Sequence, residues 1–376
     1  MKHRKKKVLV ISRDFLPSSK SSVRRILGIC NVLESNPSIE LTLLTSGSPS
    51  AIDEKFKIIR VNPYGKKKSS ESIFNTKNRS QIPLFEKDTF FWVPKVFMRI
   101  FMKQFDVIYC SVPPFSVMIL GCLLKITRLF RPFKLVIEYR DLVGFNPQSI
   151  ENLSKKIHQK IEILVLRFSN TVIVTTNGMK NTLGKRINTE KITVIRNYMS
   201  LNEFKTVKNI KPLTLDDSYF HIGYVGILST GRNPKILFSL VNYSINDKPI
   251  KLHLVGINMN SQIYLREKYH HLPNFSQIIF HDRVTREDSL KYIKSFDAAT
   301  FLINPNVSIT EGYGIPGKIY DYMLVAKSTI ADEASCKNLK TDLDLTMLDF
   351  VPGYKKIVFS EHYFLDDKLR QMKLFF

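Results

Sequence analysis

The chain has 376 residues, which at roughly 100–200 residues per domain predicts two domains. Hydrophobic residues make up 44% of it, with 26 Phe and 15 Tyr, and this excludes a chain that is disordered throughout. Its 57 Lys and Arg residues outnumber the 33 Asp and Glu residues, giving a net charge of +24. Such a surplus indicates an anionic partner: nucleic acid, an anionic membrane or a phosphorylated small molecule. The alternative is that the lysine enrichment only reflects an AT-rich genome.

The cysteines and the apolar runs bear on metal binding and location. The four cysteines lie far apart and form no CxxC pair: Cys30, Cys110, Cys122 and Cys336. We therefore expect no zinc ribbon, and reduced thiols in apolar cores. The apolar run Val8–Ser12 is too short for a signal peptide, and Val112–Leu124 is shorter than the ~20 residues that span a bilayer. We expect a cytoplasmic protein whose membrane contact is peripheral.

Strands and helices alternate in the first half of the chain. Residues Lys7–Ser12 form a continuous aliphatic run, as expected of a strand buried on both faces of a parallel sheet. The further predicted strands are Ile39–Thr45, Lys57–Val61, Phe105–Ser111, Lys134–Glu138, Thr171–Thr175 and Ile192–Ile195. The predicted helices are Ser22–Leu33, Pro114–Leu129, Ile150–Arg167 and Met179–Leu183. Residues Gly65–Asp88 are polar and predict a loop.

A second series of alternating elements follows. Its predicted strands are His221–Val225, Lys251–Val255, Gln277–His281, Ala298–Ile303 and Ser328–Ala331. Its predicted helices are Pro234–Asn242, Ile263–His270, Glu287–Phe296 and Ile315–Val325. The polar stretch Asn202–Ser218 separates the series, so we place one domain at residues 1–205 and the other at residues 206–376. This α/β pattern predicts two Rossmann-like, doubly wound domains facing a central cleft, with ligands at the carboxyl ends of the strands.

A candidate phosphate site follows the first strand of the second series. Gly226 directly follows this strand, and Arg232 and Lys235 come a few residues later. Glycine allows close approach of the backbone, and the helix that Pro234 begins presents amide dipoles that favour an anion. The two cationic side chains add donors, so the segment predicts a pyrophosphate site. The alternative is an ordinary strand–turn–helix with solvated basic residues.

A glycine-dense loop forms a second candidate site. It reads Glu311-Gly-Tyr-Gly-Ile-Pro-Gly-Lys318 and leads into a helix that contains Asp321. Backbone amides around Gly314 can cradle a phosphate, to which Lys318 adds charge. The carboxylates of Glu311 and Asp321 can accept hydrogen bonds from sugar and ribose hydroxyls. A helix cap and a surface aspartate are the alternative.

These segments resemble the donor-binding region of the family-4 glycosyltransferases. Pro316-Gly-Lys-Ile-Tyr-Asp-Tyr-Met323 is close to the version found in the subgroup that builds bacterial surface polysaccharides. The resemblance continues in family order along most of the chain, in Asp106–Pro114, Val136–Leu142, Ile192–Tyr198, Leu252–Gly256 and Ile279–Val284. The second carboxylate of the family motif aligns with Asp321, because position 319 is Ile.

The resemblance implies a GT-B fold and a retaining transfer of a hexosyl group from a nucleoside-diphosphate sugar, without a bound metal or cofactor. It implies that Gly226, Arg232, Lys235, Gly314 and Lys318 hold the donor phosphates. Asp321 and Arg283 would bind the ribose and nucleotide, while Asp141 and Glu311 would lie at the reacting sugar.

The resemblance and the charge together imply partners. The expected acceptor is a lipid-linked glycan of cell-surface polysaccharide synthesis. The basic N-terminal domain would lie on anionic lipid at the inner face of the plasma membrane, through residues such as Lys95, Arg99 and Lys103.

Three alternatives stay open at this point. The charge fits a nucleic-acid-binding protein, although we find no helix-turn-helix, RNP or zinc signature and expect no nucleic acid partner. A nucleotide-sugar epimerase would share the fold. A degenerate, non-catalytic nucleotide-sugar binder would explain the lack of glycine in Arg13–Ser22 and the atypical tail.

Overall fold

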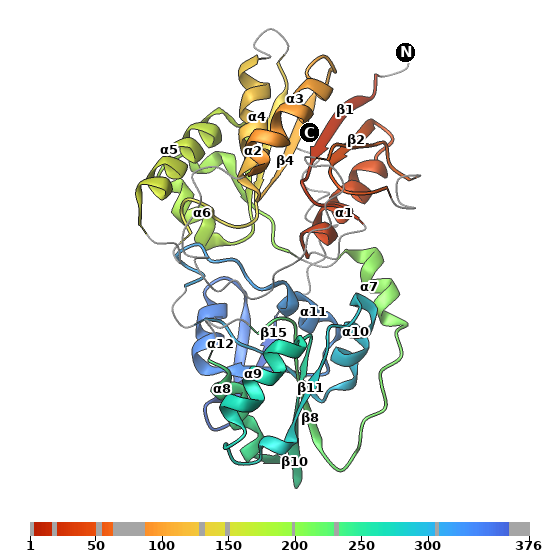
Figure 1. The fold of residues 1–376 in the computed structure, drawn as a ribbon, viewed down its shortest axis with the longest axis vertical. Coiled ribbons are helices and arrows are strands. Elements are labelled where there is room, and N and C mark those ends of the chain that lie inside the picture. The colour runs from red at the N-terminus through yellow and green to blue at the C-terminus, as the bar shows by residue number, and fades with distance from the viewer. Residues whose placement is uncertain are drawn as a thin grey trace. The chain divides into compact units, whose positions relative to one another are not determined.

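The structure is a computed structural model that describes residues 4–16, 21–49, 55–62, 87–127, 132–146, 151–197, 200–228, 233–304 and 308–360. The chain forms two compact units, each with its own sheet (Figure 1). The first unit contains the described residues up to Asn197 together with Ile309–Gly314. The second contains the described residues of Tyr198–Ser308 and Ile315–Phe364.

The first unit is built on a seven-stranded sheet with the order β3-β2-β1-β4-β5-β6-β7. Every neighbouring pair in this sheet is parallel. The strands are β1 (Lys6–Ile11), β2 (Ile39–Thr45), β3 (Ile58–Arg60), β4 (Val107–Val112), β5 (Lys134–Tyr139), β6 (Thr171–Val174) and β7 (Ile192–Val194). The residues of β4 are all buried, which confirms the inference that continuous aliphatic runs form a parallel sheet covered on both faces.

The helices of the first unit connect these strands. They are α1 (Ser21–Glu34), α2 (Lys87–Phe91), α3 (Val93–Ile100), α4 (Phe115–Thr127), α5 (Leu153–Phe168), α6 (Asn177–Gly184) and the 3-10 helix η2 (Thr189–Lys191). Trp92 is fully buried between α2 and α3, and its indole nitrogen donates to the carbonyl of Val61. The core includes aliphatic residues of β1, β4 and β5 packed against α3 and α4.

The second unit repeats this plan with a mixed sheet. The order is β11-β10-β8-β12-β13-β15-β14, and β9 pairs with β10 off this path. The strands are β8 (Phe220–Val225), β9 (Ser244–Ile245), β10 (Lys248–Val255), β11 (Ile278–His281), β12 (Ala298–Phe301), β13 (Thr329–Asp332), β14 (Leu345–Val351) and β15 (Tyr354–Phe359). From β11 to β13 the pairs are parallel, whereas β15 pairs antiparallel with both β13 and β14.

The helices of the second unit are α7 (Leu201–Lys208), α8 (Pro234–Phe238), η3 (Ser239–Asn242), α9 (Met259–Tyr269), η4 (Phe275–Gln277), α10 (Arg286–Ser295), α11 (Gly317–Val325) and α12 (Glu333–Lys340). The expected boundary at residues 205 and 206 falls inside α7, and the two units divide earlier, after Asn197. The stretch from Asn202, which we interpreted as polar linker, therefore begins as a helix. Ser200 caps it by accepting from the amide of Glu203, which is the first half of a capping box.

The hairpin of β14 and β15 is absent from the sequence-based prediction. Gly353 adopts a φ of +81° between the two strands, a conformation that favours glycine, and Pro352 precedes it. The Pro-Gly pair between two apolar stretches was the available signal. The predicted loop Gly65–Asp88 lies mostly outside the described residues, and α2 begins at Lys87.

Two smaller expectations concern the membrane and the thiols. Among the described residues, we find no helix with the length and apolarity needed to cross a bilayer. All four cysteines are free thiols; Cys122 is half-buried and the others are buried, as the sequence predicted.

Candidate functional site

Both sheets reverse their strand order beside their first strand. The reversal lies between β1 and β4 in the first unit and between β8 and β12 in the second. In doubly wound sheets, ligands bind at the carboxyl ends of the strands at such a switch point. A site is therefore expected after β1 and β4 in the first unit and after β8 and β12 in the second, next to the neighbouring strands β5 and β10.

Two glycines follow neighbouring strands of the second unit in conformations that other residues rarely adopt. Gly226 follows β8 with a φ of +118°, and Gly256 follows β10 with a φ of +95°. A Cβ atom built on Gly256 would lie 3.5 Å from Cα of Gly226. The two turns thus present closely spaced backbone that carries no side chain of its own, which suits the approach of a ligand.

The Lys318 ammonium lies directly beside this bare backbone. A Cβ on Gly226 would stand 3.3 Å from the Lys318 Nζ, and Nζ lies 3.5 Å from the ring centroid of Tyr224. Tyr224 is fully buried, and its hydroxyl donates to the carbonyl of Ile227. The ring holds the lysine in place by a cation–π contact, so the positive charge is positioned before any ligand arrives.

Helix α11 is anchored to the same strand end. The amide of Val225 donates to the hydroxyl of Tyr322 over 3.0 Å. This bond holds the second turn of α11 against the end of β8, one turn after Lys318, which is the second residue of the helix. The amide dipoles at the helix start and the lysine together make a site for an anion.

Asp321 faces away from solvent in a network of charges. Both of its carboxylate oxygens accept from Arg286, over 2.9 and 2.6 Å, and Arg286 also donates to Glu203 over 3.2 Å. Burial acts to lower the pKa of Arg286, but the charges of Asp321 and Glu203 outweigh it and raise that pKa. Arg286 could not be identified from the sequence as the partner of Asp321, because the pair joins two helices, α10 and α11.

The remaining predicted donor residues lie on other segments of the second unit. Lys235 is exposed in the first turn of α8, which Asn233 caps, and Arg283 is exposed between β11 and α10. Arg232 lies outside the described residues. The structure therefore brings Gly226 and Lys318 together, while Lys235 and Arg283 lie on segments that follow β8 and β11.

The glycine-dense loop is divided between the units. Ile309–Gly314 belongs to the first unit, where Thr182 donates to the carbonyl of Glu311 over 3.3 Å. A Cβ on Gly178 would lie only 1.8 Å from the carbonyl oxygen of Ile309, so the loop packs directly on the backbone of α6. The Glu311 side chain is exposed.

Asp141 lies beside this loop. A Cβ built on Gly314 would stand 3.1 Å from Oδ1 of Asp141. The Asp141 side chain is accessible to solvent, yet the protein atoms around it raise its pKa by burial, and the charge of Arg140 opposes this effect. Among the predicted site residues, the structure thus groups Asp141 with Gly314 in the first unit, close to the backbone of Glu311.

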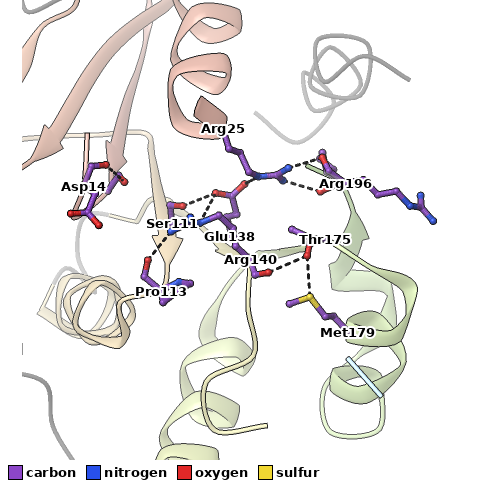
Figure 2. Close-up of polar contacts among 11 residues, drawn as sticks. Asp14, Arg25, Ser111, Pro113, Glu138, Arg140, Thr175, Met179 and Arg196 are labelled. Atoms are coloured by element: carbon purple, nitrogen blue, oxygen red, sulfur yellow. Dashed lines mark hydrogen bonds and ion pairs between the residues drawn. The ribbon is translucent and has the colours of Figure 1, made fainter. Parts of the chain in front are cut away.

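A buried ion pair supports the strand that ends at Asp141. Figure 2 shows Glu138 between the hydroxyl of Ser111, which donates over 2.6 Å, and the guanidinium of Arg25. Arg25 also donates to the carbonyls of Ile195 and Arg196. Burial acts to raise the pKa of Glu138, but Arg25 and Arg140 outweigh it and hold that pKa below its usual value.

A second buried carboxyl group holds the backbone after Asp141. Oε1 of Glu162 accepts from the amide of Gly144 over 2.6 Å, and Gln159 donates to the Gly144 carbonyl over 3.0 Å. The hydroxyl of Tyr139 accepts from the amide of Val143 over 3.0 Å. Burial raises the pKa of Glu162 to about 7, although the hydrogen bonds from Tyr139 and Gly144 act to lower that pKa. These positioning residues were missed, although a charged residue inside the apolar strand at Glu138 was a signal that a buried partner exists.

Comparison with known proteins gives structural matches only. No family model matches the chain, and no curated protein matches it. HepE from Anabaena in complex with UDP and glucose is 13% identical, with a TM-score of 0.56, over 86% of this chain and 80% of HepE. The complex of HepE with UDP-glucose is 14% identical, with a TM-score of 0.54, over 88% of this chain and 81% of HepE.

The catalytic domain of starch synthase IV from Arabidopsis thaliana, bound to ADP and acarbose, is similar in structure as well. It is 9% identical with a TM-score of 0.55, over 90% of this chain and 91% of that domain. These neighbours are GT-B glycosyltransferases. The two Rossmann-like units described above therefore have the fold of the GT-B glycosyltransferases, as the sequence predicted.

Proposed function

We propose that the protein is a glycosyltransferase that moves a hexosyl group from a nucleoside-diphosphate sugar to a glycan acceptor. The observation that carries this proposal is the Lys318 ammonium, held on the ring of Tyr224 beside the bare backbone of Gly226. This cation lies at the switch point of a sheet whose fold neighbours HepE and starch synthase IV bind UDP-glucose and ADP, respectively.

The second unit would bind the donor. Lys318, the amides at the start of α11 and the backbone of Gly226 would receive the diphosphate, whose negative charge grows as the bond to the sugar breaks. Arg232 and Lys235 would add further cationic donors. Because these groups are in place before the reaction, they stabilise the developing charge without reorganising. We expect no metal to take part, so transfer should persist in the presence of a chelator.

The sugar and the ribose would contact carboxylates. We propose that Glu311 and Asp141 contact the reacting sugar, with Gly314 leaving room beside Asp141. Asp321, whose carboxylate Arg286 holds in place, would accept a ribose hydroxyl, and Arg283 would contact the nucleotide. The resemblance to family 4 supports retention of the anomeric configuration.

The first unit would bind a lipid-linked acceptor of surface polysaccharide synthesis at the cytoplasmic face of the plasma membrane. Helices α2 and α3 carry exposed apolar side chains, with Phe90 62% exposed, Met98 76% exposed and Met102, just after α3, 72% exposed. Lys95 and Arg99 lie among them on α3. Exposed apolar side chains interleaved with cations fit an anionic bilayer surface, which takes up both.

The test is an assay that follows release of nucleoside diphosphate with and without a lipid-linked glycan acceptor. We expect release that depends on the acceptor, and at least a tenfold loss in Lys318→Met, since one charge-assisted contact is worth roughly 1.5–3 kcal/mol. Lys340→Met, an exposed lysine of α12, is the matched control and should keep full activity. Salt-sensitive binding of DNA without any effect of nucleotides would instead support a nucleic-acid-binding protein.

A further inference from the structure

We propose that the first unit carries a second anion site, a basic pocket that binds a phosphate-bearing ligand. The pocket is open to solvent and has a volume of about 460 Å³. Among the residues that the structure describes, its lining includes four cationic side chains and no carboxylate: Arg167, Lys185, Arg186 and Lys191, with Gly184 and Asn188 between them. Its volume lies within the roughly 300–1,000 Å³ that small-molecule sites occupy.

The topology of the first unit brings these residues together. Helix α5 ends at Phe168, α6 ends at Gly184 and β7 begins at Ile192, so the pocket lies where two helices end and a strand begins. In a parallel sheet, the amino ends of all strands share one edge, and each connecting helix returns to that edge. The pocket is therefore at the amino-terminal edge, whereas Asp141 follows the carboxyl end of β5. It is a separate site.

Two of the cations are fixed in place before a ligand binds. The half-buried Lys191 donates from Nζ to the carbonyls of Arg167, over 3.0 Å, and of Ser169, over 3.2 Å. The Arg186 guanidinium lies 4.8 Å from the ring centroid of Phe145. An ammonium has three donors and a guanidinium five, so both keep N–H groups for a ligand. Positions fixed in this way reduce the entropy that binding costs.

The charge of the pocket calls for a multiply charged anion. The exposed Glu190 accepts from Asn188 over 3.3 Å but does not itself line the pocket. The field extends to Lys125, whose pKa is lowered by burial and by the positive charge of Lys191. A phosphate group can accept two hydrogen bonds from one guanidinium, as a carboxylate can, but it carries more negative charge. It therefore relieves more of the repulsion among the cations.

The phosphate could belong to a lipid headgroup or to a soluble ligand, and the experiment separates them. We would measure binding of inorganic pyrophosphate by calorimetry, and binding to vesicles with 30% phosphatidylglycerol by sedimentation. The protein would carry Lys318→Met, which suppresses the proposed donor site. Lys185→Ala with Arg186→Ala is the test variant. Lys156→Ala with Lys160→Ala removes the same charge from exposed positions of α5 and is the control.

We expect the test variant to weaken binding of one of these probes by about tenfold or more, while the control stays within about twofold. If only the binding of pyrophosphate is weakened, the ligand is a soluble phosphate compound. If only the binding to vesicles is weakened, the ligand is a lipid headgroup. Equal losses in the two variants would overturn the proposal, because only net charge would then matter, and so would unchanged binding of both probes. The result is independent of the proposed function, because donor binding is measured in a separate experiment. That experiment follows the stabilisation by nucleotides of the protein that retains Lys318.

Discussion

At the scale of single residues, Gly226 and Lys318 define the proposed donor site. Gly226 combines a φ of +118°, which strains any other residue, with a Cβ position that faces the lysine ammonium at 3.3 Å. An added methyl group would therefore strain the backbone at Gly226 and also push against the ammonium of Lys318. Gly317, one residue before Lys318, has no atom within 4 Å of its Cβ position and provides a contrast.

We predict that Gly226→Ala lowers the free energy of unfolding by about 1–3 kcal/mol, because alanine disfavours this conformation. The variant should also bind nucleoside diphosphates more weakly, since the methyl group displaces Lys318. Denaturant unfolding and calorimetry measure the two effects. Gly317→Ala, at the start of a helix, should leave both unchanged. Equal stability of the two variants would show that the turn at Gly226 is not strained.

Residues at the sites were predictable to different degrees. Gly226 and Lys318 could be identified because a glycine after a buried strand and a lysine after a glycine-dense loop are visible in the sequence. The partner of Asp321 could not be identified, because Arg286 reaches it from another helix. The same holds for Arg25 and Glu162, which support the strand before Asp141 and the backbone after it. Such contacts depend on how helices pack, which periodicity does not specify.

At the scale of elements, the charge pair of Glu138 and Arg25 joins β5 to α1 and, through the carbonyl of Ile195, to the segment after β7. Both side chains are almost fully buried. Removing one partner leaves the other charge in a medium of low polarity, which typically costs about 3–5 kcal/mol.

Glu138→Gln should therefore lower the free energy of unfolding by about 3–5 kcal/mol near pH 7. The pKa of Glu138 is below that of the unfolded chain, so its contribution is present above about pH 4.5 and is lost as pH falls below that value. Denaturant unfolding at pH 7 and at pH 4 checks both points. A loss that is as large at pH 4 as at pH 7 would argue against an ionised Glu138.

Three strands of the second unit share a chain of histidines. Nε2 of His221 meets the carbonyl of Asp216, which can only accept, so His221 carries its proton there. Its Nδ1 then accepts from His253 over 2.8 Å, and Nδ1 of His253 accepts from His281 over 3.0 Å. The hydroxyl of Tyr292 completes the chain on His281. Each ring in this arrangement donates from one nitrogen and accepts at the other, so an added proton would place two donors face to face.

Stability of the second unit should therefore fall in acid. Burial, together with the charges of His281, His221 and Lys251, lowers the pKa of His253 to about 3, and burial lowers that of His281. The contribution of His253 is present above the unfolded value of about 6.5 and is lost as pH falls toward 3, by roughly 1.4 kcal/mol per pH unit, and His281 adds a loss in the same direction. Melting curves between pH 7 and pH 4 test this. His253→Gln should flatten the dependence, whereas His270→Gln, outside the chain, should not.

Most elements were predictable because their patterns are local. The strands β1, β2, β4, β5 and β8 follow from aliphatic runs, and α5 follows from helical spacing. Helix α7 and the hairpin of β14 and β15 were missed, since their signals are a capping serine and a Pro-Gly turn. Short polar helices and edge strands are stabilised by tertiary packing, which composition does not reveal.

At the scale of the whole molecule, the proposed membrane contact rests on the net charge of +24 and on the exposed apolar side chains of α2 and α3. Phe90→Ser with Met98→Ser should reduce sedimentation with anionic vesicles, because two inserted side chains are lost. Met259→Ser with Ile263→Ser removes exposed apolar residues of α9 and should have no effect. Equal binding of both variants would mean that α2 and α3 do not contact the bilayer.

The most direct test of the donor site is thermal melting with a panel of nucleoside diphosphates and their sugars, in the wild type and in Lys318→Met. One nucleotide series should stabilise the wild type, by roughly 2.7 kcal/mol at a hundred times its dissociation constant, and should stabilise Lys318→Met much less. Stabilisation by no nucleotide, or equal stabilisation of both proteins, would contradict a nucleotide-sugar site at Gly226 and Lys318.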